Sequence, residues 1–167
     1  MHKNIQNENQ IIQAITDKDG KQKDYAYDKL SQLIREDDEN AGTTTLYTYD
    51  NGGNLSKVTT YAYTTAETPS GTPLSVETYG YDSTWKDKLV SYNGQSIGYD
   101  AIGNPTTYPG SSLKWEDGRT LKEITTADGS TIAYTYAVDG TRIGKTVTDS
   151  TGTSTETRYV MDGDKIL

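Results

Sequence analysis

The stretch from Tyr47 to Leu55 constrains the fold of this chain more than any other. Two tyrosines separated by one residue open it, and in a strand they share one face because side chains alternate between faces. Asp50 follows, and an Asp side chain accepts hydrogen bonds from the amides of a following turn. Gly53 can take positive φ where the chain restarts at Asn54. The stretch therefore predicts strand, tight turn and strand, with a type I turn and a glycine bulge.

The same unit recurs along the chain, with anchor residues at positions 5, 27, 49, 81, 99, 115, 136 and 161. A spacing near twenty residues is typical of repeat proteins, in which each unit packs against its neighbours. Three copies depart from the pattern: Ser31 replaces the Gly, Trp115-Glu116 replaces Tyr-Asp, and Ala137 follows the second Tyr. The residues assigned to the repeat motif are Tyr25, Tyr27, Asp28, Tyr47, Tyr49, Asp50, Gly53, Tyr79, Tyr81, Asp82, Tyr99, Asp100, Gly103, Trp115, Gly118, Tyr134, Tyr136, Gly140, Tyr159 and Asp162.

This recurrence predicts an all-β protein: an antiparallel meander of repeated β-hairpins that forms a curved sheet, with no helix longer than a turn. We expect the tyrosine pairs to project to one common face, to be mostly buried, and to stack across neighbouring strands as an aromatic ladder. The motif Asp residues are expected to accept hydrogen bonds from turn amides.

Composition bears on whether such a chain folds. Leu, Ile and Val make up 26 of the 167 residues, Phe is absent, and the net charge is −8, values that are typical of disordered chains. The 14 Tyr and 2 Trp change this balance, because each buries about 150–250 Å² when packed. At roughly 25 cal/mol per Å², burial of these aromatic side chains stabilises the folded state at least as much as burial of the aliphatic side chains. We therefore expect a folded chain, whose acidic balance disfavours nucleic acid and anionic lipid as partners.

Several segments outside the motif also give expectations. Residues 1–10 are a weak first copy or a tail, and the turn at 17–20 lacks the Glu that ends a calcium loop. The acidic stretch 36–42 is interpreted as a solvent-facing loop, with a cation site as the alternative. Residues 64–73 form the tip of a long hairpin that reaches beyond the sheet. Prolines at both ends of 105–109 predict a weak or edge strand.

The chain offers little for catalysis or metal binding. His2 is the only histidine and there is no cysteine, which disfavours Ser-His-Asp, Cys-His and zinc sites. No GxxxxGK loop is present, and the many carboxylates are interpreted as turn caps rather than as a glycosidase pair. We therefore expect no catalytic residue, metal or cofactor. A functional alternative is glycan contact through the aromatic residues Tyr61, Tyr63 and Trp85.

The unit Tyr-x-Tyr-Asp-x-x-Gly-Asn/Arg-Leu resembles the YD repeat, also called the rearrangement-hotspot (Rhs) repeat, most clearly at residues 47–55 and 97–105. The resemblance covers nearly the whole chain in degenerate form. Proteins with such repeats include Rhs polymorphic toxins, toxin-complex cocoon proteins, bacterial wall-associated proteins and teneurins. In them, hairpins join into one long sheet that spirals into a hollow shell. The family's self-cleaving aspartyl core domain has no match here.

The resemblance implies a non-catalytic structural segment of a shell that encloses or displays a C-terminal, toxin-like passenger domain, outside the cell or at its surface. The implied partners are neighbouring repeats and that passenger. The alternative is a cell-surface adhesion module that binds carbohydrate. The last copy is incomplete, no apolar run approaches 18 residues, and the N-terminus lacks an apolar signal segment. We therefore expect a fragment of a longer protein, without a membrane span, that can self-associate through its sheet edges.

Overall fold

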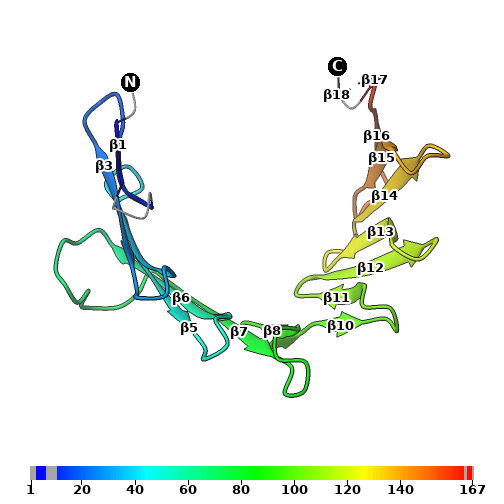
Figure 1. The fold of residues 1–167 in the computed structure, drawn as a ribbon. Helices are drawn as coiled ribbons and strands as arrows, with labels where there is room; N and C mark the ends of the chain where they lie inside the picture. Colours follow the sequence, from blue (N-terminus) through cyan, green and yellow to red (C-terminus); the bar gives the residue numbers. More distant parts are fainter. Residues whose placement is uncertain (1–2, 7–10, 164, 167) are drawn as a thin grey trace. The chain divides into compact units, whose positions relative to one another are not determined.

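The computed structural model describes residues 3–6, 11–163 and 165–166, and these residues contain strands and turns but no helix. The fold class predicted from the repeats, an antiparallel meander of β-hairpins, is confirmed. Contacts divide the chain into two compact units, Met1–Gly94 and Gln95–Leu167, which are described separately. In each unit consecutive strands lie side by side (Figure 1). No helix in the described residues is long and apolar enough to cross a membrane.

In the first unit, eight strands follow one another in sheet order, each antiparallel to the next. They are β1 (Lys3–Gln6), β2 (Ile12–Thr16), β3 (Gln22–Tyr27), β4 (Leu33–Asp38), β5 (Thr43–Tyr49), β6 (Leu55–Ala62), β7 (Ser75–Tyr81) and β8 (Leu89–Tyr92). Residues 7–10, which belong to the expected first copy, lie outside the described part of the chain.

The second unit begins with the short strand β9 (Gln95–Ser96) and continues with a seven-stranded antiparallel sheet in chain order. The seven strands are β10 (Gly98–Tyr99), β11 (Pro105–Tyr108), β12 (Ser111–Glu116), β13 (Thr120–Thr126), β14 (Thr131–Tyr136), β15 (Arg142–Thr148) and β16 (Ser154–Arg158). A final two-stranded pair consists of β17 (Met161–Asp162) and β18 (Lys165–Ile166).

The hairpin of β5 and β6 has the local geometry that its motif sequence predicts. In the hairpin of β5 and β6, the register shifts between Thr48 and Tyr49. The Asp50 amide donates to the Asn54 carbonyl at 2.9 Å, and the Gly53 amide donates to the Asp50 carbonyl at 3.1 Å. Gly53 has φ of +86°, a conformation that glycine adopts without strain. This is a tight turn closed by a glycine bulge.

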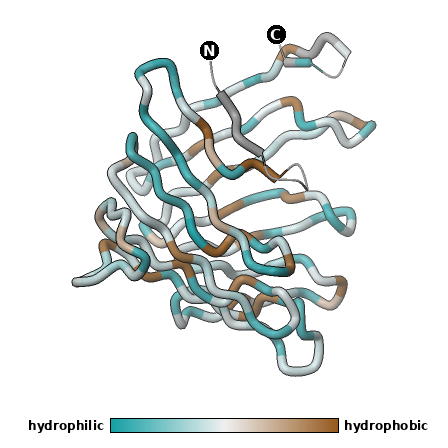
Figure 2. The backbone as a smooth tube through the Cα atoms, turned by 60° about the vertical axis from the view of Figure 1, so that its left-hand side comes forward, coloured by the Kyte–Doolittle hydropathy of each residue, from teal (hydrophilic) through white to brown (hydrophobic). Residues whose placement is uncertain are grey.

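The tyrosine pairs lie on one face of the sheet, but they are half-buried. In β3, β5 and β14 the residue between the two tyrosines is exposed, so both tyrosines face the other way. Ala14 and Ile97 are the buried hydrophobic residues among those described. Figure 2 shows the apolar positions as short brown segments interrupted by white and teal. Each tyrosine of the four predicted pairs is thus partly buried and none is fully exposed, although none reaches the burial of Ala14 or Ile97.

Two local expectations need correction. The first residues of the stretch 36–42, which was predicted as a solvent-facing loop, belong to strand β4. This strand ends at Asp38, which is 8% exposed. Strand β11 is not an edge strand, since it pairs with both β10 and β12, and Pro105 is tolerated as its first residue. The long connection between β6 and β7 leaves the sheet as a wide loop (Figure 1), and Arg35 of β4 binds the backbone of its first half.

Candidate functional site

The second aromatic residue of several motif copies binds the preceding hairpin. The Tyr49 hydroxyl donates to the Leu33 carbonyl at 2.8 Å, beyond the point where backbone pairing between β4 and β5 ends at Arg35 and Leu46. The side chain thus satisfies a carbonyl at a strand start that the ladder does not reach. The same contact is made by Tyr27 to Ile12 (3.0 Å), Tyr81 to Leu55 (2.9 Å), Tyr136 to Leu121 (2.8 Å) and, through its indole N–H, Trp115 to Pro105 (2.6 Å).

These hydroxyl contacts, rather than ring stacking, connect the hairpins. Among the described residues, the ring pair is Tyr79 with Tyr92, whose centroids lie 5.3 Å apart at 56°. Both hydroxyls of this pair donate to Glu77. The expected aromatic ladder is therefore wrong as a general description. In the second unit, the guanidinium of Arg142 instead lies over the rings of Tyr134 and Tyr159.

The motif Asp carboxylates bind the amides of their own turns. Oδ1 of Asp50 accepts from the amides of Gly52 (2.8 Å) and Asn54 (2.9 Å), and the Asn54 side chain donates to Oδ2. The Asn54 side-chain amide and then the backbone amides hold the pKa of Asp50 below its usual value. Equivalent contacts are made by Asp28, Asp100 and, in a longer turn, Asp82. The Asp162 side chain lies outside the described part of the chain.

The residue after the turn glycine connects one turn to the next, a role that we did not predict from the sequence. The side-chain amide of Asn104, which is 3% exposed, donates to Asp100 and to the Gly118 carbonyl of the following turn. Asn54 donates in the same way to the carbonyl of Lys86. The recurrence of an amide residue after the glycine position, at 32, 54 and 104, is the signal that indicates this role.

The acidic residues of β4 are paired with cations of the chain itself. Lys23 lies 2.7 Å from Asp38 and 3.0 Å from Glu36. The hydrogen bond to Asp38 is the main cause that raises the pKa of Lys23 above its usual value. Burial raises the pKa of Asp38, but the contact with Lys23 and two turn amides outweigh it, so the net pKa is lowered. In the described residues, no three acidic or His side chains are grouped to hold a metal.

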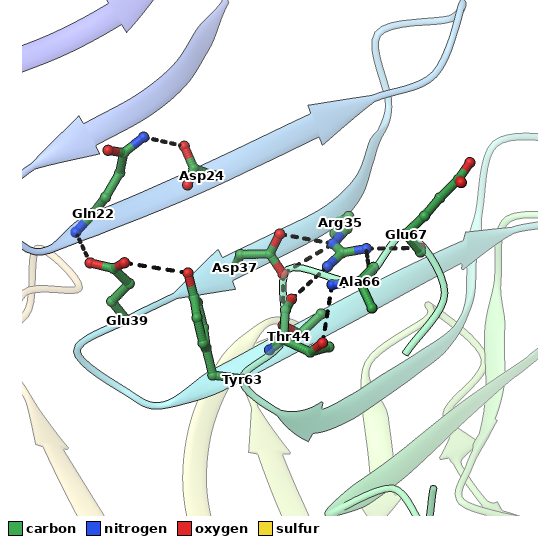
Figure 3. A network of polar contacts seen from close by, with 10 residues as sticks. Gln22, Asp24, Arg35, Asp37, Glu39, Thr44, Tyr63, Ala66 and Glu67 are labelled. Atoms are coloured by element: carbon green, nitrogen blue, oxygen red, sulfur yellow. Dashed lines mark hydrogen bonds and ion pairs between the residues drawn. The ribbon is translucent and has the colours of Figure 1, made fainter. Parts of the chain in front are cut away.

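Arg35 is the centre of a second polar network, on the face opposite the tyrosines (Figure 3). Its Nε donates to Asp37 at 2.8 Å, and its terminal nitrogens donate to backbone carbonyls of the connection between β6 and β7. Thr44, which is fully buried, donates to Asp37 at 2.7 Å. At the margin of the network, the hydroxyl of Tyr63 donates to Glu39.

The three aromatic residues predicted to contact glycans do not share one surface. Tyr61 and Tyr63 lie at the end of β6 where the long connection begins, and both are half-buried. Trp85 lies in the turn between β7 and β8, at the opposite end of the strands, and is 64% exposed. Lys88 lies 5.8 Å from its ring centroid. A glycan site would therefore use either the two tyrosines or Trp85.

Two shallow hollows lie where neighbouring hairpins separate beside a tyrosine pair. One, of about 430 Å³, is lined by Tyr25, Tyr27 and Asp28. The other, of about 510 Å³, is lined by Tyr134, Tyr136 and Glu116. In both hollows the second tyrosine of the pair binds a backbone carbonyl, and the carboxylates of Asp28 and Glu116 bind a turn amide and Lys122. Neither hollow assembles a nucleophile with a base.

The chain is similar to proteins of the repeat class that the motif indicates. Residues 27–66 match the family model of the RHS repeat. The tRNA3(Ser)-specific nuclease WapA of Bacillus spizizenii and the tRNA nuclease WapA of Bacillus subtilis are each 32% identical over 142 residues, or 84% of this chain. The chain spans about 5% of the length of these relatives.

Solved structures show the same fold. The crystal structure of TcdB2-TccC3-Cdc42 matches 95% of this chain and 9% of its own, with a TM-score of 0.72 and 18% identity. The crystal structure of TcdB2-TccC3-TEV matches 87% of this chain and 9% of its own, with a TM-score of 0.51 and 11% identity. The recurring aromatic and Asp motif is thus recognised correctly: this chain carries the RHS repeat.

Proposed function

We propose that this chain is a non-catalytic structural segment of a shell that encloses or displays a C-terminal, toxin-like passenger domain. The observation that carries the proposal is where the motif side chains bind: tyrosine hydroxyls, Asp carboxylates and Asn amides contact the chain's own backbone. No buried side-chain nitrogen or oxygen in the described residues lacks a hydrogen bond. Residues used in this way hold a sheet together and are not available for chemistry.

The relatives support the non-catalytic part of the proposal. The name of each WapA protein specifies a nuclease, and the match covers 5% of each WapA, so we assign the nuclease activity to another part of those proteins. By analogy, this segment supports a passenger without acting on its substrate. Its partners are neighbouring repeats and that passenger, and its location is outside the cell or at its surface.

Deletion of residues 22–62 from the protein that carries this segment tests the proposal. We expect its C-terminal domain to be digested faster by an added protease, while the domain's own activity, measured after release, is unchanged. A deletion that leaves protease resistance intact would contradict the shell function. Degradation of tRNA by the isolated chain, relative to a buffer control, would contradict the non-catalytic assignment.

A second candidate function, binding of a sugar, rests on the exposed ring of Trp85. An exposed indole provides a flat apolar surface and a polar N–H, which suits the face of a sugar ring. Glycan-array binding that Trp85→Ala removes, and that Tyr61→Ala leaves unchanged, would favour this function over a purely structural one.

A further inference from the structure

The connection between β6 and β7, residues 63–74, folds back over the polar face of the first unit. Its two ends continue the backbone pairing, since the Tyr63 amide donates to the Gly42 carbonyl at 2.8 Å and the Leu74 amide donates to Thr60 at 2.7 Å. Between these ends the chain leaves the sheet ladder. Gly71, with φ of +94°, lies near its tip.

One guanidinium group holds the first half of this connection. Arg35 donates to the carbonyls of Thr64 (2.8 Å), Ala66 (2.8 Å) and Glu67 (2.9 Å). A guanidinium has five N–H donors in a planar fork, so it can bind several converging carbonyls together with one carboxylate. The carboxylate is Asp37, and the side chains of Arg35 and Asp37 are 15% and 17% exposed. Figure 3 shows these contacts meeting at one point.

This mode of attachment differs from that of the motif turns. Those turns are fixed by an Asp of the same turn, which accepts from amides two and four residues on. The 63–74 connection depends on a side chain that is 29 to 32 residues away in sequence. A second support is Thr44, whose hydroxyl accepts from the Thr64 amide at 3.0 Å. The connection can therefore detach without breaking the pairing of β5, β6 and β7.

We propose that residues 64–73 form a strap that opens and closes over the polar face as one unit, with Arg35 as its latch. Opening breaks the contacts that Arg35 and Thr44 make with the strap and uncovers Thr44 and Asp37. Strands β5 and β6 meanwhile stay paired over their whole length. Segments that open in this way exchange their amides independently of the surrounding sheet. Because the carbonyl of Glu67 is itself bound by the latch, opening also frees the Glu67–Thr68 peptide bond from its fixed position.

Limited digestion by a glutamyl endopeptidase, with hydrogen exchange, tests the proposal. In Arg35→Gln, we expect the rate of cleavage after Glu67 and the rate of deuterium uptake over 63–74 to rise about tenfold or more. Loss of the free energy of one charge-assisted hydrogen bond is enough to cause a change of this size. Arg35→Lys should lie between this variant and the wild type, because an ammonium cannot reproduce the fork. Lys57→Gln, which removes an exposed cation of the same sheet, is the matched control and should match the wild type.

Deuterium uptake in β2 and β3 shows whether Arg35 holds only the strap or stabilises the whole sheet. The proposal requires that this uptake stay at the wild-type level in Arg35→Gln while the strap exchanges faster. It is overturned if the strap of Arg35→Gln exchanges and is cleaved at the wild-type rate. It is equally overturned if β2, β3 and the strap all exchange faster together, since Arg35 would then stabilise the whole unit.

Discussion

The hydroxyl of Tyr49 donates a 2.8 Å hydrogen bond to the carbonyl of Leu33, the first residue of the neighbouring strand β4. The backbone ladder between these strands ends at Arg35 and Leu46, so the phenol ring spans the gap that opens beyond it. Strands in a twisted sheet diverge towards their ends. The long, rigid tyrosine side chain is suited to keep consecutive hairpins together where backbone pairing has stopped.

Tyr49→Phe tests this relationship. The substitution keeps the ring but leaves the Leu33 carbonyl without its donor, which should lower the free energy of unfolding by about 0.5–1.5 kcal/mol. Tyr47→Phe is the matched control, because Tyr47 lies on the same strand and its hydroxyl makes no hydrogen bond within the described residues. Urea unfolding of both variants provides the measurement. Equal losses for the two would show that the hydroxyl contact does not stabilise the sheet.

The local part of this arrangement could be predicted from the sequence. The Tyr-x-Tyr spacing places two side chains on one face, and the positions of Asp50 and Gly53 define the turn and the bulge without reference to the rest of the chain. The amide of Asn54, by contrast, contacts Lys86, which is 32 residues away. Its partner depends on how successive hairpins align.

The same reasoning explains what the sequence leaves open. How deeply the tyrosines are buried depends on what covers the sheet, and no local pattern specifies that. The prolines and glycine of the strap indicate only a break in the ladder. Its actual position depends on Arg35, a residue that the motif does not include.

Gly53→Val should destabilise the chain more than Gly52→Val. Gly53 has φ of +86°, where a β-branched residue is strained, so we expect a loss of about 1–3 kcal/mol. Gly52 is not in this conformation, and an added Cβ would lie 3.3 Å from Oδ1 of Asp50, a contact that a small shift relieves. Thermal melts that rank the two variants in the opposite order would show that the bulge does not require glycine.

Stability should decrease in acid because the turn carboxylates have lowered pKa values. Hydrogen bonds from the Asn54 side chain and from turn amides lower the pKa of Asp50, and the Trp85 and Thr84 amides lower that of Asp82. A carboxylate with a lowered pKa in the folded state stabilises that state above its unfolded pKa. It loses this contribution as pH falls through the folded value.

We therefore expect the melting temperature to be nearly constant from neutral pH to about pH 5 and to fall below about pH 4. Asp50→Asn should show a smaller drop, since the amide oxygen still accepts hydrogen bonds but does not titrate. Differential scanning calorimetry over a pH series measures both. A melting temperature that rises on acidification would contradict the role of the carboxylates.

Self-association of the isolated chain is the last expectation, and it follows from the sheet edges. Within the described residues β16 pairs only with β15, so its outer side presents unpaired backbone groups. The tyrosine face of each unit is also partly exposed.

The net charge of −8 opposes close approach of two copies. Because salt screens this repulsion but does not weaken backbone pairing or apolar contact, association should increase with ionic strength. Light scattering over a concentration series at low and high salt measures it. A monomer at every concentration and salt level would show that the edge and the aromatic face do not associate.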